Sequence, residues 1–185
     1  MSRGVRRLVG AVIILLLVGT VALVLMMRPS LEDDQNAVDD AWVPLRAPLV
    51  ERYDALGSVD EELRAAGGSD RDVTVELTEE LDAWREAAIE PDDTADAEAE
   101  VEIANSLEGL SARVLATVNA SERLRSSQGL TDALATFASR VPEPELVRGY
   151  NNAVGTFDDT RTSLSHRLTA AVFGYEARTS LVLAE

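Results

Sequence analysis

The chain has 185 residues, no cysteine, and 33 acidic residues against 17 basic ones, all arginine, for a formal net charge of −16. The absence of cysteine excludes disulfides, thiolate nucleophiles and thiolate metal sites, so the fold depends on packing alone. The negative charge disfavours binding to nucleic acid and favours cationic or basic partners, although its simplest effect is solubility. No glycine-rich phosphate loop or dinucleotide fingerprint occurs, so the sequence predicts no cofactor.

Residues 8–27 form an uninterrupted apolar segment that predicts a transmembrane helix. The twenty residues include no charge, Asn, Gln, His or Pro. At about 1.5 Å per residue they make a helix of roughly 30 Å, the thickness of a bilayer's hydrocarbon core. A cleaved signal peptide has a shorter apolar run and a small-residue cleavage site, which Leu25 to Pro29 lack. A buried core helix would have a polar face. We therefore expect an uncleaved anchor that contacts the lipid bilayer.

Charges on either side of this segment predict its orientation. Arg3, Arg6 and Arg7 precede it, whereas Arg28 alone follows it before a run of acidic residues. The basic flank normally stays in the cytoplasm. We therefore expect a short cytoplasmic tail (1–7), a single span, and an extracytoplasmic body (28–185) that forms one domain. All 33 acidic residues and 14 of the 17 arginines lie in this body, so its formal charge is −19.

Apolar residues recur at helical spacing through most of the body. We expect Pro29 to end or offset the membrane helix, and Pro44 and Pro48 to kink or break the next helix between Val43 and Pro48. Gly67 and Gly68 mark its end. The expected helices of the body run from Ser30 or Leu31 to about Gly67, from Asp70 to about Ile89, from Thr94 to about Ser126, from Leu130 to Ser139, and from Glu145 to about Ala171.

The last of these expected helices has the most regular apolar stripe, which includes Leu164 and Leu168. No window shows sustained period-two alternation, and no Asn-Gly or Asp-Gly hairpin signal occurs. The fold class is therefore predicted to be all-α: one transmembrane helix followed by an antiparallel bundle of about four long helices.

Four short motifs follow the anchor in order. Val38-Asp39-Asp40-Ala41-Trp42 looks like Val-Asp-x-Ala-Trp, and Arg52, Asp54 and Leu56 look like Arg-x-Asp-Leu. Tyr150, Asn151, Ala153, Val154 and Phe157 resemble Tyr-Asn-x-Ala-Val-x-x-Tyr-Asn. Leu168, Ala170, Phe173, Gly174 and Tyr175 resemble Leu-x-Ala-x-x-Phe-Gly-Phe. In this order the motifs resemble those of the LemA family of bacterial proteins.

The resemblance is loose over residues 31–175 and strongest over 145–175. The chain lacks the family's Ile-Pro-Asn-Leu-Val, and it reads Leu-Ser-His-Arg at 164–167 in place of Phe-Pro-Ser-Asn. The resemblance implies a single-pass membrane protein with a long helical outer domain, in a family whose activity is poorly defined. It supplies no catalytic residue. The motif positions are candidates for interaction with a partner: Trp42, Arg52, Asp54, Tyr150, Asn151, Phe157, Phe173 and Gly174.

Two features raise the question of metal binding. Residues 90–102 hold seven acidic side chains and no base: Glu90, Asp92, Asp93, Asp96, Glu98, Glu100 and Glu102. Hard cations such as calcium bind several carboxylates, but the spacing is not that of an EF-hand, and a solvated loop with an acidic first helical turn is the simpler interpretation. His166 is the only histidine, whereas zinc sites usually need two or more His or Cys ligands. We expect His166 to be structural or exposed, and we predict no metal site.

Three further residues have both a structural and a functional interpretation. Asn151 would fix helix register as part of a buried polar pair, or else bind a neighbouring helix or a ligand. Trp42 and Trp84 are expected to anchor the core, although an exposed tryptophan would mark a partner surface.

The sequence as a whole favours a non-enzymatic, membrane-anchored interaction or scaffold module of the bacterial cell envelope. Its expected partner is another envelope protein, and its oligomeric state is open. The alternative is an extracytoplasmic sensor of a cation or small ligand, based on the acidic charge. An envelope hydrolase is a weaker alternative, because so many carboxylates make any pair of them uninformative.

Overall fold

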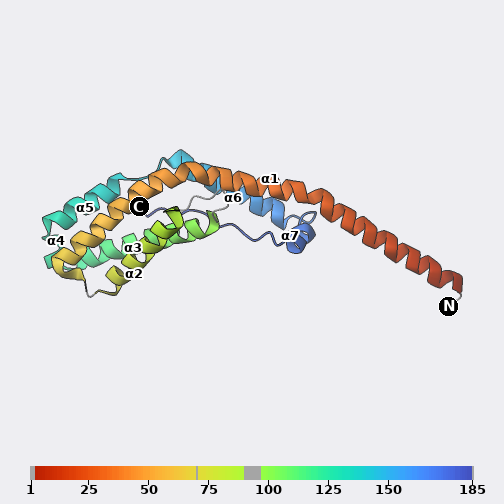
Figure 1. Cartoon of the computed structure of the whole chain (residues 1–185), viewed down its shortest axis with the longest axis horizontal. Coiled ribbons are helices and arrows are strands. Elements are labelled where there is room, and N and C mark those ends of the chain that lie inside the picture. Colours follow the sequence, from red (N-terminus) through yellow and green to blue (C-terminus); the bar gives the residue numbers. More distant parts are fainter. Residues whose placement is uncertain (1–2, 70, 90–96, 185) are drawn as a thin grey trace. The chain divides into compact units, whose positions relative to one another are not determined.

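The structure is a computed structural model that describes residues 3–69, 71–89 and 97–184, with side chains from residue 12 onward. Every regular element in these ranges is helical and none is a strand, so the all-α prediction is confirmed (Figure 1). The elements are α1 (Arg3–Leu63), a π-helical turn η1 (Arg64–Gly68), α2 (Asp72–Ile89), α3 (Ala97–Ala120), α4 (Glu122–Arg125), α5 (Gln128–Ser139), α6 (Pro144–Thr162) and α7 (Arg167–Phe173).

Helix α1 is continuous for 61 residues and passes through Pro29, Pro44 and Pro48. The expected helix end at Pro29 and the expected break between Val43 and Pro48 are therefore wrong. Each internal proline removes one backbone hydrogen bond, at a cost of about 3 kcal/mol or more. The stripe around Pro44 and Pro48 is fully buried, and its burial offsets that cost: Trp42, Leu45, Leu49, Tyr53, Leu56, Val59 and Leu63.

The N-terminal part of α1 is long and apolar enough to cross a membrane, and almost none of its most apolar window is buried within the molecule. Leu15 and Met26, for example, are 75% and 77% exposed. Most apolar side chains of this segment are therefore left uncovered by the part of the chain that the structure describes.

The helical run that begins with α1 continues through η1 and ends at the predicted glycines. Gly67 has φ 87°, in the left-handed region that glycine adopts without a Cβ clash. The carbonyl of Gly68 accepts a hydrogen bond from the Thr74 hydroxyl at 2.8 Å, which fastens the turn to the first turn of α2. The predicted helix starts at Asp70 and Thr94 lie outside the described residues.

Two helices expected to be continuous are interrupted. Ser121 is extended (φ −120°, ψ 115°) between α3 and α4. The last expected helix ends at Thr162, and α7 begins only at Arg167. Ser163 Oγ lies 2.9 Å from His166 Nδ1, a local side-chain bond that competes with helical backbone bonding. The apolar register ends there, so Leu164, predicted to face inward, is 95% exposed.

The chain divides into two compact units, which we describe separately. Unit 1 comprises residues up to Val38 together with Ala153–Arg178. The Thr169 hydroxyl donates to the Val24 carbonyl at 3.4 Å, and the Arg28 guanidinium lies 5.0 Å from the centre of the Phe173 ring. These contacts attach α7 to α1 within unit 1.

Unit 2 comprises Asp39–Asn152 and the residues from Thr179 onward. Helices α2 and α3 lie side by side and pack against each other (Figure 1). The rings of Tyr53 and Trp84 join α1 to α2 at 4.8 Å, and those of Trp42 and Tyr150 join α1 to α6 at 5.2 Å. Both tryptophans are buried, so their prediction as core anchors is confirmed.

Candidate functional site

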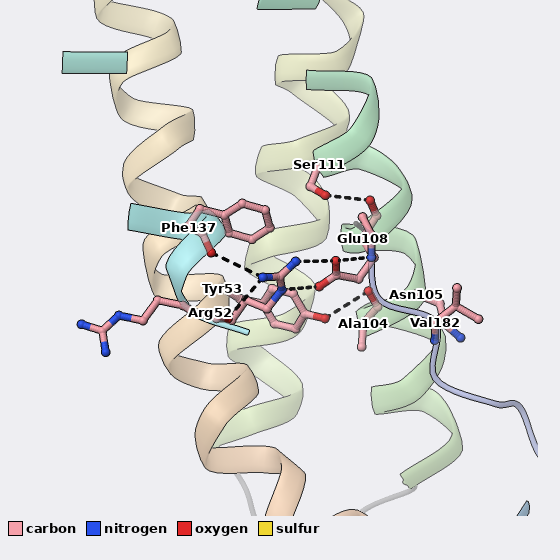
Figure 2. A network of polar contacts seen from close by, with 10 residues as sticks. Arg52, Tyr53, Ala104, Asn105, Glu108, Ser111, Phe137 and Val182 are labelled. Atoms are coloured by element: carbon pink, nitrogen blue, oxygen red, sulfur yellow. Dashed lines mark hydrogen bonds and ion pairs between the residues drawn. The ribbon is translucent and has the colours of Figure 1, made fainter. Parts of the chain in front are cut away.

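A buried ion pair lies at the centre of unit 2. Arg52 of α1 and Glu108 of α3 are 1% and 2% exposed. The guanidinium Nε donates to Glu108 Oε1 at 2.7 Å, and Nη2 donates to Oε2 at 2.8 Å (Figure 2). Two parallel charge-assisted hydrogen bonds are the strongest arrangement for this pair. The pair fixes the register of α1 against α3.

The remaining donor of Arg52 reaches a third helix. Nη1 donates to the carbonyls of Phe137 and Arg140 at 3.4 and 3.2 Å, at the C-terminal end of α5. The guanidinium also lies 4.1 Å from the centre of the Phe137 ring (Figure 2). The negative end of the helix dipole and the face of the ring both attract a cation. One arginine therefore joins α1, α3 and α5.

Tyr53 lies beside this pair and donates its hydroxyl to the Ala104 carbonyl at 3.2 Å. Burial raises the pKa of the Tyr53 phenol well above its ordinary value of 10.0, and the nearby Glu108 carboxylate raises it further. Both effects disfavour the phenolate, so Tyr53 stays a neutral donor in the fold.

This pKa shift predicts a loss of stability in alkali. The unfolded chain would ionise Tyr53 near pH 10, whereas the fold keeps it neutral. The contribution of neutral Tyr53 to the free energy of unfolding is therefore complete below about pH 10. Above that pH it falls by about 1.4 kcal/mol per pH unit. Denaturant titrations between about pH 8 and pH 11 should give a shallower alkaline loss for Tyr53→Phe than for the wild type. Equal slopes would contradict the shift.

A second buried carboxylate of α3 lies eight residues before Glu108. Glu100 is 3% exposed and accepts hydrogen bonds from the Trp42 indole N–H and from Arg46 Nε, the latter at 2.8 Å. Glu100 and Glu108 are both on the buried face of α3. Each is used to bind a side chain of α1.

The extended residues 179–184 of unit 2 are bound through their backbone by side chains of α3 and α6. Asn151 accepts a hydrogen bond from the Leu181 N–H and donates one to the Leu181 carbonyl, each at 2.9 Å. Asn105 donates to the Ser180 carbonyl at 2.9 Å and accepts the Val182 N–H at 2.8 Å. Glu98 accepts the Thr179 N–H at 3.0 Å, and the Tyr150 hydroxyl donates to the Thr179 carbonyl at 2.8 Å. We call α3 and α6 with these side chains the tail groove.

The groove ends at an apolar cavity of about 470 Å³. Its wall includes Arg52 and Phe137, the apolar side chains of α3 and α5, and Leu183 and Ala184 of the tail. The Ala184 N–H donates to Glu108 Oε2 at 2.9 Å. The ion pair and residue 184 of the tail therefore share Glu108, and Arg52 of the same pair lines the cavity.

The structure brings half of the predicted interaction positions together. Trp42, Arg52, Tyr150 and Asn151 all take part in the contacts of unit 2 described above. Asp54 is exposed and lies outside them. Three others belong to unit 1: Phe157, whose ring centre lies 6.4 Å from that of Tyr175, Phe173, and Gly174, which caps α7 with φ 72°.

Asn151 differs from its predicted role. It is only half-buried and binds the backbone of Leu181, so it does not form the buried polar pair that would fix helix register. His166 contacts the neighbouring hydroxyls of Ser163 and Ser165, as its predicted structural role requires.

The acidic segment is only partly within the described residues: Glu90, Asp92, Asp93 and Asp96 lie outside them. Glu98 and Glu100 bind protein groups, as given above. Over residues 3–69, 71–89 and 97–184, no group of three or more His, Asp or Glu side chains is placed to hold a metal ion.

Sequence reasoning did not single out Glu108 or Asn105, and it named Glu98 only as part of the acidic segment. A signal for Glu108 was present, because Glu100, Ala104 and Glu108 recur every four residues on the face of α3 that carries its apolar stripe. Two carboxylates on an apolar face predict buried partners. Asn105 and Glu98 had no comparable signal, since their partner is extended backbone far along the chain. A comparison with protein-family models, curated proteins and solved structures found no match to this chain.

Proposed function

We propose that the protein is a single-pass, membrane-anchored helical module of the bacterial cell envelope that binds another protein outside the cytoplasm without catalysis. The exposed apolar part of α1 supports the anchor, because the described residues cover almost none of its most apolar window. The arginines at positions 3, 6 and 7 support a cytoplasmic N-terminus. The body is proposed to form the antiparallel bundle that the sequence predicts.

One observation carries the proposal of protein binding. The tail groove binds a stretch of polypeptide by the N–H and C=O groups that every protein has, through Asn105 and Asn151. Backbone recognition of an extended segment is a recurring mode of protein–protein binding. Helices α3 and α6 thus have the chemistry needed to bind a polypeptide segment. The resemblance to the LemA family is consistent with this role.

A sensor of a small apolar ligand is a second candidate. The cavity of about 470 Å³ beside Arg52 has the size and apolar lining of small-molecule sites. A ligand there would contact Phe137, which is bound to Arg52. A rise in melting temperature with a small apolar compound, absent in a Leu134→Trp variant that fills the cavity, would favour this candidate.

Protease treatment of intact spheroplasts tests the topology. Because the body is proposed to lie outside the cytoplasm, added protease should digest it while the membrane is intact. A cytoplasmic marker protein, which should survive until lysis, is the control. Survival of the body until lysis would reverse the orientation and remove the proposed site of action.

Crosslinking in cells tests the interaction. A photoreactive amino acid at Val182, which is 66% exposed beside the groove, should join the chain to a partner protein. The adduct should weaken when Asn105 and Asn151 are both changed to alanine. The matched control places the same photoreactive residue at Val75, which is 50% exposed on α2. The same adducts from both positions would remove the groove from the proposal.

A further inference from the structure

In the tail groove, the backbone of residues 180–182 is hydrogen-bonded on both sides, as the backbone of a β-strand is by its two neighbouring strands. In an extended strand, the N–H and C=O of one residue point to one side, and the flanking groups point to the other. Asn151 of α6 binds both groups of Leu181, while Asn105 of α3 binds the carbonyl of Ser180 and the N–H of Val182. Two asparagines on two helices thus take the places of two adjacent strands.

This arrangement imposes few demands on the sequence that occupies it. The contacts with Asn105, Asn151 and Glu98 go to backbone atoms, which are the same in every residue except proline. Of the side chains at 181 and 182, Leu181 is 2% exposed and Val182 is 66% exposed. The groove therefore needs an extended segment with an apolar residue at the position of Leu181 and backbone N–H groups at 179, 181, 182 and 184.

The far end of the groove supplies a second apolar position. Leu183 and Ala184 line the cavity of about 470 Å³, and the Ala184 N–H binds Glu108. The tail does not fill this space. A segment with a larger apolar side chain at the position of Leu183 or Ala184 would bury that side chain in the cavity and gain apolar contact that the tail lacks.

Of residues 179–184, only Leu181 has a buried side chain. The hydrogen bonds of this segment replace bonds that the same groups make with water, so each neutral bond contributes about 1 kcal/mol net, and the bonds to the Glu98 and Glu108 carboxylates contribute somewhat more. Fixing the backbone of an extended segment costs conformational entropy of a similar size. The free energy of docking residues 179–184 is therefore a small difference between opposing contributions. A partner segment can replace a segment that is docked so weakly.

We propose that the tail groove is a binding site for an extended apolar segment of a partner protein, and that residues 179–184 occupy it in cis until that partner replaces them. The inference rests on the proposed function and names its binding site and the chemistry of its partner. Proline is excluded from the partner at the positions of 179, 181, 182 and 184, because all four N–H groups are bound.

Binding of a labelled peptide to the full-length chain in lipid nanodiscs tests the proposal. The probe is a fluorescent peptide with the chain's own residues 176–184. Leu181→Asp in the protein weakens the cis segment by burying a charge, so this variant should bind the peptide at least about tenfold more tightly than the wild type. Val182→Asp changes an exposed neighbour and is the matched control, with affinity close to the wild type.

Two changes should abolish that gain. A peptide with proline at the position of Val182 lacks the N–H that Asn105 accepts, and Asn151→Ala in the Leu181→Asp protein removes both bonds to residue 181. Equal peptide affinity in Leu181→Asp and the wild type, or binding that neither change affects, would overturn the proposal. Light scattering tests whether the tail of a second copy occupies the groove. A wild-type dimer that Leu181→Asp converts to monomers would assign the groove to that second copy. This outcome would refute the cis arrangement.

Hydrogen exchange of the wild type needs no variant. The amides of Leu181 and Val182 should exchange much faster than buried amides of α3, because the tail undocks without unfolding the helices. Equal protection of the two sets would mean that the segment leaves only on global unfolding, which contradicts its replacement by a partner. If these peptide tests fail, crosslinking at Val182 can still identify a partner that binds elsewhere. The proposal of protein binding and the proposal of the tail groove as its site can therefore fail separately.

Discussion

Glu108→Ala is expected to lower the free energy of unfolding by about 3–5 kcal/mol, because it leaves the Arg52 charge buried and unpaired. Arg52 is 1% exposed, so its guanidinium depends on protein groups for most of its hydrogen bonds. The variant also removes the acceptor of the Ala184 N–H. A domain is typically stable by only about 5–15 kcal/mol, so this loss brings it close to unfolding. Denaturant titration of the full-length chain in detergent, followed by circular dichroism, measures the change.

Two controls separate a buried charge from a lost contact. Glu51→Ala breaks the ion pair with Arg140, whose side chains are 66% and 53% exposed, and should cost at most about 1 kcal/mol. The double variant Arg52→Met with Glu108→Leu removes both charges, and it should be more stable than Glu108→Ala. A cost for Glu108→Ala as small as that for Glu51→Ala would show that Arg52 is solvated in solution.

Trp42→Ala is expected to lower the free energy of unfolding by about 3–5 kcal/mol relative to the wild type. This is the usual cost of replacing a fully buried aromatic residue by alanine. Trp42 is 0% exposed, and its ring centre lies 5.2 Å from that of Tyr150. The substitution opens a cavity between α1 and α6 and removes a donor from Glu100. The same denaturant titration measures the loss.

Neighbouring substitutions show which part of Trp42 matters. Val43→Ala changes an adjacent residue that is 59% exposed and should alter stability by at most about 0.5 kcal/mol. Trp42→Phe keeps an aromatic ring but lacks the indole N–H, so its cost should be intermediate, about 1–3 kcal/mol. If Trp42→Ala were no more harmful than Val43→Ala, the contact between α1 and α6 would not contribute to the stability of unit 2.

The sequence alone was sufficient for the elements whose cause is local. Helix formation depends on hydrogen bonds between residues four apart and on apolar residues at the same spacing. The buried stripe from Leu45 to Leu63, the helix end at Gly67 and the helix from Asp72 to Ile89 all follow from such short-range patterns. The apolar segment at 8–27 was equally plain, because it needs only length and composition.

Local rules failed where opposing effects had to be weighed. Proline disfavours a helix interior by a known amount, but Pro44 and Pro48 lie between residues whose burial in unit 2 contributes more. The same is true in reverse at Ser163, where a local bond with His166 interrupts a helix that the apolar pattern alone would continue. Periodicity gives no measure of either opposing term.

Tertiary structure alone decided the candidate site. Arg52 and Glu108 are 56 residues apart, and Asn105 and Val182 are 77 apart. Such pairs form only when packing brings distant segments to within about 3 Å, and nothing in the composition of either segment specifies the other. The sequence therefore determined that this chain is helical with one apolar N-terminal segment, whereas packing determined that Arg52 is buried against Glu108 and that two asparagines bind an extended tail.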